Sequence, residues 1–423
     1  MDLSVVIPAW NEANNLRKLL PFLHQVLGGL SIDYEIIVVD NHSPDGTAQV
    51  SEDERAIAVQ QSAPGYGGAL WAGFERAAGR YVLTMDADLS HMPDFVPAMW
   101  ARRDDAELVI ASRYVEGGRA DMPAYRYALS LILNWVFTRA LSLPVKDISS
   151  GFRLYHAAAL HGLELESTDF DALEEILIKC YTAGCKIIEV PMHYVPRDAG
   201  KSKVQLFKFG LSYLRTLVRM WRLRNSVASA DYDARAYNSP IWLQRYWQRK
   251  RLAIITSMAD SSEPALDIGC GSSRILGALG KHTVGVDISL GRLLYSRRYL
   301  RPLANASILA LPFATGAFRQ VVCSQVIEHV RTGDQPFLEM ARILGPGGHL
   351  ILGTPDYGSW QWPVTERLYR LFAPDAYGVQ HITHYSRAGL TGMLEAMGFR
   401  LLRVAYICGG EMILLLSKDG ENN

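Results

Sequence analysis

Short apolar runs alternate with stretches of helical periodicity through the first half of the chain. Strands that alternate with helices predict a mainly parallel sheet with helices on both faces, so we expect an α/β fold. The series closes with a helix over 171–183 and a strand that ends at Val190. The earlier strand-like runs begin at Leu3, Tyr34, Arg80 and Glu107, and helical stretches begin near Glu12, Asp45, Gly67 and Pro93.

A second series follows the small, polar stretch NSVASAD at 225–231. After a helical stretch over 240–259, strand-like runs recur as PALDIG, HTVGVD, RQVVCS and HLILGT. The chain has 423 residues, about three times the usual domain size of ~150. We therefore predict two α/β domains, at 1–224 and 238–423, joined by a linker at 225–237.

Composition narrows the choice of partner and compartment. Lys plus Arg and Asp plus Glu both number 43, so no overall field favours nucleic acid. The five cysteines form no CxxC pair, which fits reduced thiols in the cytoplasm. The chain starts directly with a strand and has no apolar stretch of the ~20 residues that span a bilayer. We expect a cytoplasmic protein without a signal peptide.

Two aspartates mark the end of one predicted strand. Asp86 and Asp88 follow the apolar run YVLTM, and alternate residues of an extended strand point the same way. Ligands of open α/β sheets bind at the carboxyl ends of the strands. Carboxylate oxygens suit a hard divalent cation that bridges to a diphosphate, although a solvated Asp pair after a strand is also common.

Other polar residues follow neighbouring strands. Pro8, Trp10 and Glu12 stand at the mouth of the first strand, and Asp40 ends the next one. A carboxylate at Asp40 can accept hydrogen bonds from a nucleobase or ribose. Asp45 either contributes to the same site or caps the following helix.

Six segments occur here in the order seen in family 2 glycosyltransferases. The chain resembles most the polyprenyl-phosphate (dolichyl-phosphate-type) mannosyl- and glucosyltransferases of the GT-A fold, over residues 1–222. Ser90 stands where that family often has Gln, which leaves the choice of metal open. The segments are VVIPAWNE, VVDNHSPDGT, GYGGALWAGFERAAGRYVLTMDADLSHMP, ASRYVEGG, DISSGFR and EVPMHYVPRDAGKSK.

The resemblance implies a role for each matching residue, with a GDP- or UDP-sugar as donor and a polyprenyl phosphate as acceptor. Nucleoside contacts are implied for Pro8, Trp10, Glu12 and Asp40. Contacts with the diphosphate and its Mg²⁺ or Mn²⁺ are implied for Asp86 and Asp88. Contacts with the acceptor phosphate or the sugar are implied for Arg113, Arg126 and Ser130. A basic loop over the phosphates is implied for Arg197 and Lys203.

The chemistry of the acceptor leaves two readings open. A sugar hydroxyl needs a carboxylate base, whereas a polyprenyl phosphate is already ionised near pH 7 and needs none. Glu174 and Glu175 either supply such a base or line the exposed face of their helix.

A basic amphipathic helix over 205–224 favours contact with an anionic membrane surface, at the inner face of the membrane. A second, largely apolar helix over 125–141 has Arg126 and Arg139 near its ends. The alternative is that the basic helix packs on its own domain or on the second one. We expect Lys208, Arg215, Arg219 and Arg222 to form one face of it, opposite Leu214, Leu217, Val218 and Trp221.

The second half carries a glycine-rich turn after its first strand. Gly269 and Gly271 let the backbone approach a ligand closely, and Asp287 ends the next strand, where a carboxylate can bind ribose hydroxyls. Arg274 stands where a dinucleotide-binding turn would have its third glycine, which disfavours NAD.

The second half resembles class I S-adenosylmethionine-dependent methyltransferases with a Rossmann-like fold, over 265–400. The matching segments are ALDIGCGSS, VGVDIS, LPFATGAF, VVCSQVIEHV, ARILGPGGHLILGTPD and HITHYSRAGLTGMLEAMGF. Glu328, His329, His381 and His384 either line the methyl acceptor or are structural. We therefore expect a bifunctional transferase; in the alternative, the first domain glycosylates a saccharide hydroxyl and the second only docks. The resemblance implies S-adenosylmethionine contacts for Asp267, Gly269, Gly271, Asp287 and Ser307, although an acid often replaces Ser307.

Overall fold

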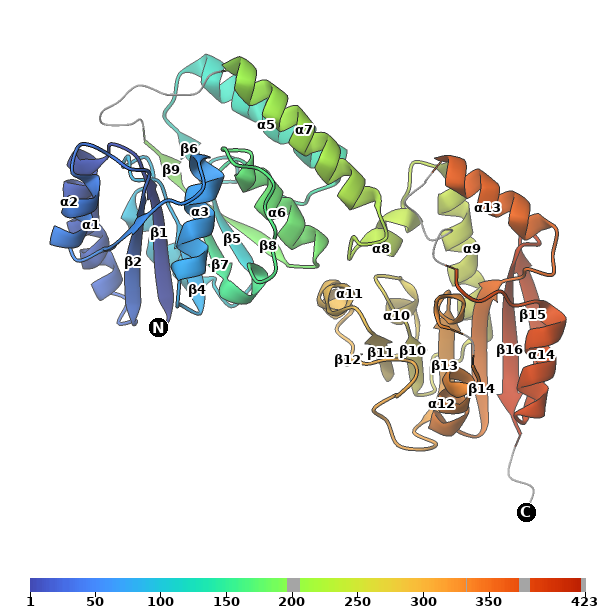
Figure 1. The fold of residues 1–423 in the computed structure, drawn as a ribbon. Helices are drawn as coiled ribbons and strands as arrows, with labels where there is room; N and C mark the ends of the chain where they lie inside the picture. Colours follow the sequence, from blue (N-terminus) through green and yellow to red (C-terminus); the bar gives the residue numbers. More distant parts are fainter. Residues whose placement is uncertain (196–205, 332, 373–380, 420–423) are drawn as a thin grey trace. The chain divides into compact units, whose positions relative to one another are not determined.

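The computed structural model describes residues 1–195, 206–331, 333–372 and 381–419, and the side chains of 206–209 and 368–372 lie outside that description. The chain divides into two compact units, Met1–Leu223 and Arg224–Asn423. Each unit has its own seven-stranded sheet (Figure 1). Among the described residues, no helix combines the length and apolarity that crossing a bilayer requires.

The first unit is built on a sheet of strand order β3-β2-β1-β4-β7-β5-β8. Its strands are parallel except β7, which runs antiparallel to β4 and β5. A separate ribbon pairs β6 with β9. The bounds are β1 (Leu3–Ala9), β2 (Tyr34–Asp40), β3 (Ile57–Gln60), β4 (Tyr81–Thr84), β5 (Leu108–Ser112), β6 (Arg119–Ala120), β7 (Arg153–His156), β8 (Ile187–Pro191) and β9 (His193–Tyr194).

Helices cover both faces of this sheet, as the alternating sequence pattern predicts. Val5 and Ile7 of β1 pack into one apolar cluster with α1, whereas Val6 between them packs into the other with α3, α5, α6 and α7. Successive strand residues face opposite ways, so both faces are buried. The helices are α1 (Ala13–Gly28), α2 (Thr47–Asp53), α3 (Gly65–Arg76), α4 (Val96–Ala101), α5 (Ala124–Leu141), α6 (Ala172–Thr182) and α7 (Leu206–Asn225).

The second unit has the strand order β12-β11-β10-β13-β14-β16-β15. Strands β10 to β14 are parallel, and β15 and β16 add an antiparallel edge. Strand β10 lies between β11, which follows it in the chain, and β13, so the strand order reverses at β10. The bounds are β10 (Ala265–Ile268), β11 (Thr283–Asp287), β12 (Leu303–Asn305), β13 (Phe318–Ser324), β14 (Leu344–Pro355), β15 (Phe399–Ile407) and β16 (Glu411–Lys418).

Helices pack on this sheet from both sides as well, because Val322 faces the cluster with α9 while its neighbours Val321 and Cys323 face α12 and α14. The segment 225–237, expected as a linker, contains α8 and belongs to the second unit, where Asp233 N donates to Ser272 Oγ at 3.0 Å. The helices are α8 (Tyr232–Tyr237), α9 (Trp242–Met258), α10 (Ile275–Ala278), α11 (Leu290–Ser296), α12 (Gln335–Ile343), α13 (Gln361–Phe372) and α14 (Arg387–Ala396).

Candidate functional site

Polar residues gather at the carboxyl edge of the first sheet. Strands β1, β2 and β4 are adjacent and parallel, so their carboxyl ends share one edge. Trp10 and Glu12 follow β1, Asp40 ends β2, and Asp86 lies two residues beyond β4. The sheet order reverses between β1 and β4, and open α/β sheets bind ligands at such a switch point.

The Asp86–Asp88 turn is held by its neighbours. Tyr66 Oη donates to Asp86 Oδ1 at 3.0 Å, and Asp88 Oδ1 accepts from Ser90 N at 3.1 Å and Ser90 Oγ at 2.5 Å. Burial, and then the Asp86 carboxylate, raise the pKa of Tyr66 well above its ordinary value, so the phenol stays a donor. The two carboxylates and the Ser90 hydroxyl offer only oxygen atoms, the donors that Mg²⁺ and Mn²⁺ prefer. Sequence reasoning missed Tyr66, although it lies in a matched segment.

The residues expected at the nucleoside differ in exposure. Trp10 is 46% exposed, whereas Asp40 is buried, with its carboxylate accepting from Ser43 N at 3.1 Å and Gln60 Nε2 at 3.3 Å. Pro8 and Glu12 are half-buried. The two residues follow neighbouring strands, so an exposed indole suited to stacking and a buried carboxylate suited to hydrogen bonding share one sheet edge.

Asp45 serves as a helix cap. Its Oδ1 accepts from Thr47 N and its Oδ2 from Ala13 N, both at 3.1 Å. These amides begin α2 and α1, so one carboxylate satisfies the open ends of two helices. The structure therefore supports the capping interpretation of Asp45.

Arg113 is tied to Asp147. Its Nε and Nη2 donate to the two carboxylate oxygens at 2.8 and 2.7 Å. Although burial lowers the pKa of Arg113, Asp147 more than offsets this effect and keeps the pKa above its usual value. This two-point pairing with one carboxylate fixes the orientation of the Arg113 guanidinium, which stays positively charged.

The remaining residues expected at the acceptor lie on or near α5. Ser130 Oγ accepts from Tyr114 Oη at 2.8 Å, and Arg126 is exposed in the first turn of the helix. Arg197 and Lys203, expected in a basic loop, lie outside the described residues.

Glu174 and Glu175 are both buried, so the expectation that they line an exposed helix face is wrong. Glu175 accepts from Lys179 Nζ at 2.7 Å and Arg219 Nη2 at 2.5 Å. Burial raises the pKa of Glu174 to about 8, despite the nearby Arg153 cation. Helix α7 contacts both carboxylates, through Tyr213 beside Glu174 and Arg219 at Glu175.

The prediction of a basic face on α7, opposite its apolar stripe, is wrong for Arg219 and for the position of the face. Arg219 is bound to Glu175 and to Glu166 at 3.1 Å, so its charge is turned inward. Arg215 and Arg222 are exposed beside the apolar stripe rather than opposite it, and the Lys208 side chain lies outside the described residues. Among the side chains of α7 that the structure describes, the exposed large apolar ones are Leu211, Leu214, Val218 and Trp221.

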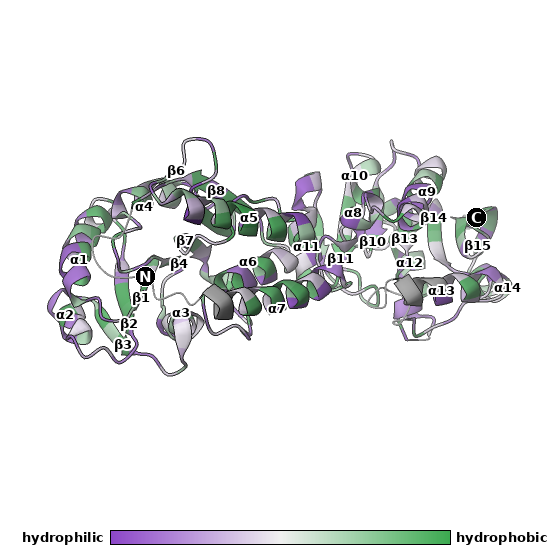
Figure 2. Ribbon diagram, turned by 90° about the horizontal axis from the view of Figure 1, so that it is seen from above, coloured by the Kyte–Doolittle hydropathy of each residue, from purple (hydrophilic) through white to green (hydrophobic). Residues whose placement is uncertain are grey.

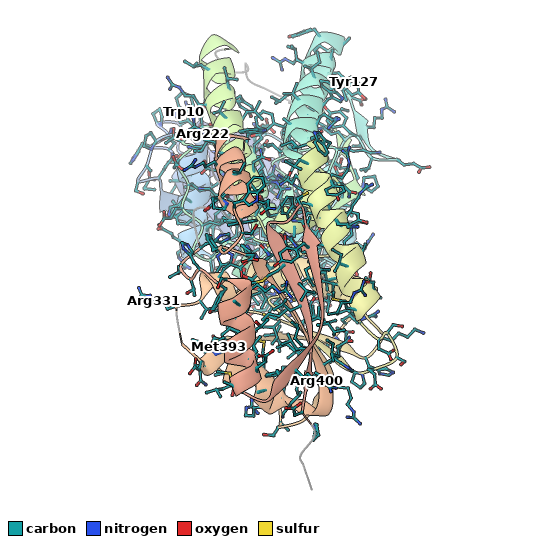
Figure 3. All side chains as sticks on the ribbon, turned by 90° about the vertical axis from the view of Figure 1, so that its right-hand side faces the viewer. Trp10, Tyr127, Arg222, Arg331, Met393 and Arg400 are labelled. Carbon is teal, nitrogen blue, oxygen red and sulfur yellow. The ribbon has the colours of Figure 1, made fainter. Side chains whose placement is uncertain are left out.

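Helix α5 extends this surface. It lies beside α7 in Figures 1 and 2, and Phe137 contacts Tyr213 across them, with ring centroids 6.0 Å apart. Much of α5 is coloured hydrophobic in Figure 2, and Figure 3 labels Tyr127 on α5 and Arg222 on α7. We call the exposed apolar residues of the two helices the α5–α7 surface. Those of α5 are Tyr125, Tyr127, Leu129, Leu131, Ile132 and Trp135.

The second unit contains a cavity of about 730 Å³ at the carboxyl ends of β10, β11 and β13. All the residues expected at S-adenosylmethionine except Gly271 line it directly. Gly271 N donates to Asp287 Oδ2 at 2.9 Å and so shapes the same turn. The lining residues among those expected are Asp267, Gly269, Asp287 and Ser307.

The cavity fits a cationic nucleoside cofactor. Gly269 has φ +66°, and a Cβ there would lie 2.2 Å from Val326 Cγ2, so only glycine leaves this turn open. Asp267 Oδ2 is buried without a hydrogen-bond partner among the described residues. Burial, and then Asp287, raise the pKa of Asp267 to about 8. A bound cation would relieve that unsatisfied carboxylate.

Residues of α8 and α9 also line this cavity, and sequence reasoning missed them. Asp233, Gln244 and Gln248 contribute polar groups to its wall. Asp233 lies in the segment expected as a linker. The small polar residues of that segment predict a linker and gave no indication that it lines a cavity.

Two family models match the chain, one in each unit. Residues 4–163 match the glycosyl transferase family 2 model, and residues 241–404 match a methyltransferase domain model. Their order agrees with the two resemblances found in the sequence.

Individual relatives match the first unit. An undecaprenyl-phosphate mannosyltransferase of Micrococcus luteus is 31% identical over 217 residues, covering 48% of this chain and 88% of its own. A dolichol-phosphate mannosyltransferase of Pyrococcus furiosus is 34% identical over 238 residues, covering 54% of this chain. The chain spans 66% of the length of that archaeal relative.

Solved structures resemble each unit separately. Glucosyl-3-phosphoglycerate synthase of Mycobacterium tuberculosis is 21% identical, with a TM-score of 0.42, over 53% of this chain and 79% of its own. A S-adenosylmethionine-dependent methyltransferase of Thermotoga maritima, a possible histamine N-methyltransferase, is 18% identical, with a TM-score of 0.37. It covers 43% of this chain and 94% of its own.

Proposed function

We propose, since the chain belongs to glycosyltransferase family 2 and carries a methyltransferase domain after it, that it performs two transfers. The first unit moves a sugar from a GDP- or UDP-sugar to a polyprenyl phosphate, with inversion. The second unit methylates a small molecule, glycan or glycolipid with S-adenosylmethionine. The observation that carries the first assignment is the pair Asp86 and Asp88 at the sheet edge shared with Asp40 and Trp10.

The donor end follows from the chemistry of those side chains. Asp40 and Trp10 would hold the nucleoside, while Asp86 and Asp88 would hold Mg²⁺ or Mn²⁺ against the diphosphate. The cation supplies neutralisation of the charge that develops on the leaving diphosphate. Tyr66 keeps Asp86 oriented through its 3.0 Å hydrogen bond.

A phosphate acceptor is favoured because both candidate bases are engaged or covered. Glu175 is neutralised by Lys179 and Arg219, and Glu174 is buried beneath α7. An ionised phosphate needs no base, whereas a saccharide hydroxyl does. Arg113, fixed by Asp147, would supply a cation for phosphate oxygens through its remaining N–H groups.

The α5–α7 surface would bring this unit to an anionic membrane surface, where such an acceptor resides. Its apolar side chains suit the acyl boundary, and the exposed Arg126, Arg215 and Arg222 suit anionic headgroups. This placement would keep the enzyme peripheral, at the cytoplasmic face.

In the second unit, Asp287 would accept from the ribose hydroxyls and Asp267 would face the positive end of the cofactor. Methyl transfer from a sulfonium mainly requires alignment of the acceptor with the methyl group. The cavity gives the domain a place for a cofactor, which favours an active domain over a docking module.

Donor turnover by Asp86→Ala plus Asp88→Ala tests the first assignment. We expect nucleotide release from GDP- and UDP-sugars to fall at least about 100-fold, with the fold retained by circular dichroism. Glu175→Gln and Glu174→Gln distinguish the two acceptor classes. Transfer to a saccharide hydroxyl would lose most of its rate in these variants, whereas transfer to a phosphate would not. Full activity of the double aspartate variant would overturn the metal–diphosphate assignment.

A further inference from the structure

We propose that Glu328, His329 and His381 bind a divalent transition-metal ion in the cavity of the second unit, where it would coordinate a hydroxyl of the methyl acceptor. The inference rests on the proposed methyl transfer. It adds a metal and an acceptor class, and its test is independent of that reaction.

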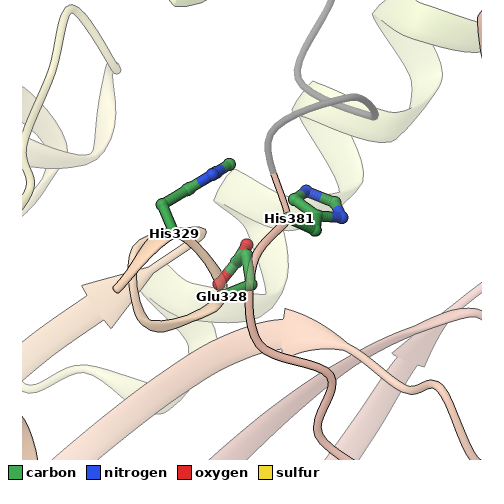
Figure 4. Close-up of side chains that lie close together, drawn as sticks. All are labelled: Glu328, His329 and His381. Atoms are coloured by element: carbon green, nitrogen blue, oxygen red, sulfur yellow. The ribbon is translucent and has the colours of Figure 1, made fainter. Parts of the chain in front are cut away.

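The three side chains converge on one point. One ligand atom from each lies within 4.8 Å of the other two. In Figure 4 the Glu328 carboxylate points between the two imidazoles, with His329 on one side and His381 on the other. The two rings have centroids 5.0 Å apart and are tilted by 57°, so they do not stack on each other. One carboxylate and two imidazoles gathered in this way could supply three ligands to one metal ion.

Glu328 gives the strongest indication of a cation site. Its side chain is fully buried, and Thr354 Oγ1 donates to Oε2 at 3.1 Å. Its Oε1 is buried and has no hydrogen-bond partner among the described residues. A buried carboxylate oxygen without a partner is costly, and a metal ion would satisfy it.

Backbone hydrogen bonds hold the two halves of the cluster together. Glu328 O accepts from Ile382 N at 2.8 Å and from Thr383 N at 3.1 Å. Thr383 Oγ1 donates to Val330 O at 2.7 Å. These bonds bring the residue after His381 against η4 (Ile327–His329), although the two segments are far apart in the chain.

Tyr357 orients one imidazole. Its Oη lies 2.8 Å from His381 Nδ1. When Nδ1 donates to that oxygen, Nε2 carries the lone pair that a metal requires, as is usual for liganding histidines. Two histidines and one glutamate form a known ligand set of catalytic zinc sites, which keep a further position open for water or substrate.

The open position would serve methyl transfer to oxygen. His329 and His381 line the same cavity as Gly269 and Asp287, the residues proposed to hold S-adenosylmethionine. Coordination lowers the pKa of a hydroxyl, which releases its proton to water. The oxygen then forms a bond to the methyl carbon, the sulfur–methyl bond breaks, and its electron pair stays on the sulfur as the neutral thioether.

Metal titration of the full chain tests the site. We would use the Asp86→Ala plus Asp88→Ala background, without nucleotide, so that the first unit does not contribute. Zn²⁺ binding is followed by calorimetry, and Co²⁺ binding by its visible absorption. We expect one equivalent to bind this background, and Glu328→Gln or His381→Ala to weaken binding about tenfold or more. The matched control is His282→Ala, which replaces an exposed histidine of the same unit and should leave metal binding unchanged.

Circular dichroism shows that the variants are folded, and S-adenosylmethionine binding, measured on the same samples, separates the two proposals. Cofactor binding without metal binding would overturn the metal site and leave the methyltransferase proposal intact. Metal binding that is equal in all four proteins would also overturn it. Metal binding lost in the two ligand variants but without cofactor binding would retain the metal site and remove the methyltransferase proposal.

Discussion

At the scale of single residues, Gly269 controls the shape of the turn at the cofactor cavity. A Cβ there would overlap Val326 Cγ2, and φ is +66°. We expect Gly269→Ala to weaken S-adenosylmethionine binding at least about tenfold and to lower stability by about 1–3 kcal/mol. Calorimetry and denaturant unfolding measure the two effects.

Gly316→Ala is the matched control for the backbone effect alone. Gly316 has φ +69°, and the nearest atom to a Cβ there is 3.7 Å away. The same loss of cofactor affinity in both variants would mean that close approach at Gly269 is not what matters.

Glu174 gives the first unit a pH-dependent stability. Because burial raises its pKa to about 8 from 4.5, the folded state keeps its proton between these values and the unfolded state does not. The contribution of Glu174 is therefore full below pH 4.5 and is lost as pH rises towards 8, by about 1.4 kcal/mol per pH unit at most.

Unfolding of the wild type and Glu174→Gln at several pH values checks this. We expect the free energy of unfolding of Glu174→Gln to increase steadily relative to that of the wild type from pH 5 to pH 8. The exposed Glu164→Gln provides the comparison. A difference that does not change with pH would contradict the raised pKa.

At the scale of elements, the α5–α7 surface should bind membranes. Trp135 is 67% exposed on α5, and its indole suits the boundary between headgroups and acyl chains. We expect Trp135→Asp to reduce sedimentation with anionic vesicles several-fold at low salt. Trp242→Asp, which alters a 68% exposed Trp of α9, should sediment like the wild type. Equal binding by both variants would show that α5 is not the contact.

The main parallel strands could be predicted, because β1, β2, β4 and β10 are mostly apolar runs followed by glycine or a polar turn. Strands β3, β12, β15 and β16, at or next to the sheet edges, were not predicted. Strand β7 was missed because its first residue, Arg153, is charged yet fully buried. Its guanidinium is satisfied by backbone carbonyls such as Leu173 O, at 2.6 Å. A local pattern contains no signal for such a long-range contact.

The lack of long-range information in local sequence patterns also decides which site residues could be predicted. The residues at strand ends could be predicted, since the carboxyl edge of a parallel sheet gathers them. The pairing of Arg219 with Glu175 could not be, because helical periodicity shows which residues share a face but not what packs there. The approach of His381 to Glu328 likewise depends on a loop contact distant in sequence.

At the scale of the whole molecule, each unit has its own sheet, core and proposed site, so their functions should be separable. We expect Asp267→Asn to weaken S-adenosylmethionine binding about tenfold and to leave sugar transfer unchanged. Asp86→Ala plus Asp88→Ala should show the reverse pattern. Calorimetry and donor turnover on both proteins check this, and loss of both activities in either variant would contradict independent sites.

Sugar transfer to a phosphorylated lipid tests the central claim most directly. The full chain would be incubated with Mg²⁺ or Mn²⁺, radiolabelled GDP- and UDP-sugars, and anionic vesicles that contain polyprenyl phosphate. We predict label in the lipid extract with one of these donors, and none with EDTA, with Asp86→Ala plus Asp88→Ala, or with unphosphorylated polyprenol. Label that appears only on a saccharide hydroxyl, or transfer to lipid that persists in the double variant, would contradict the account.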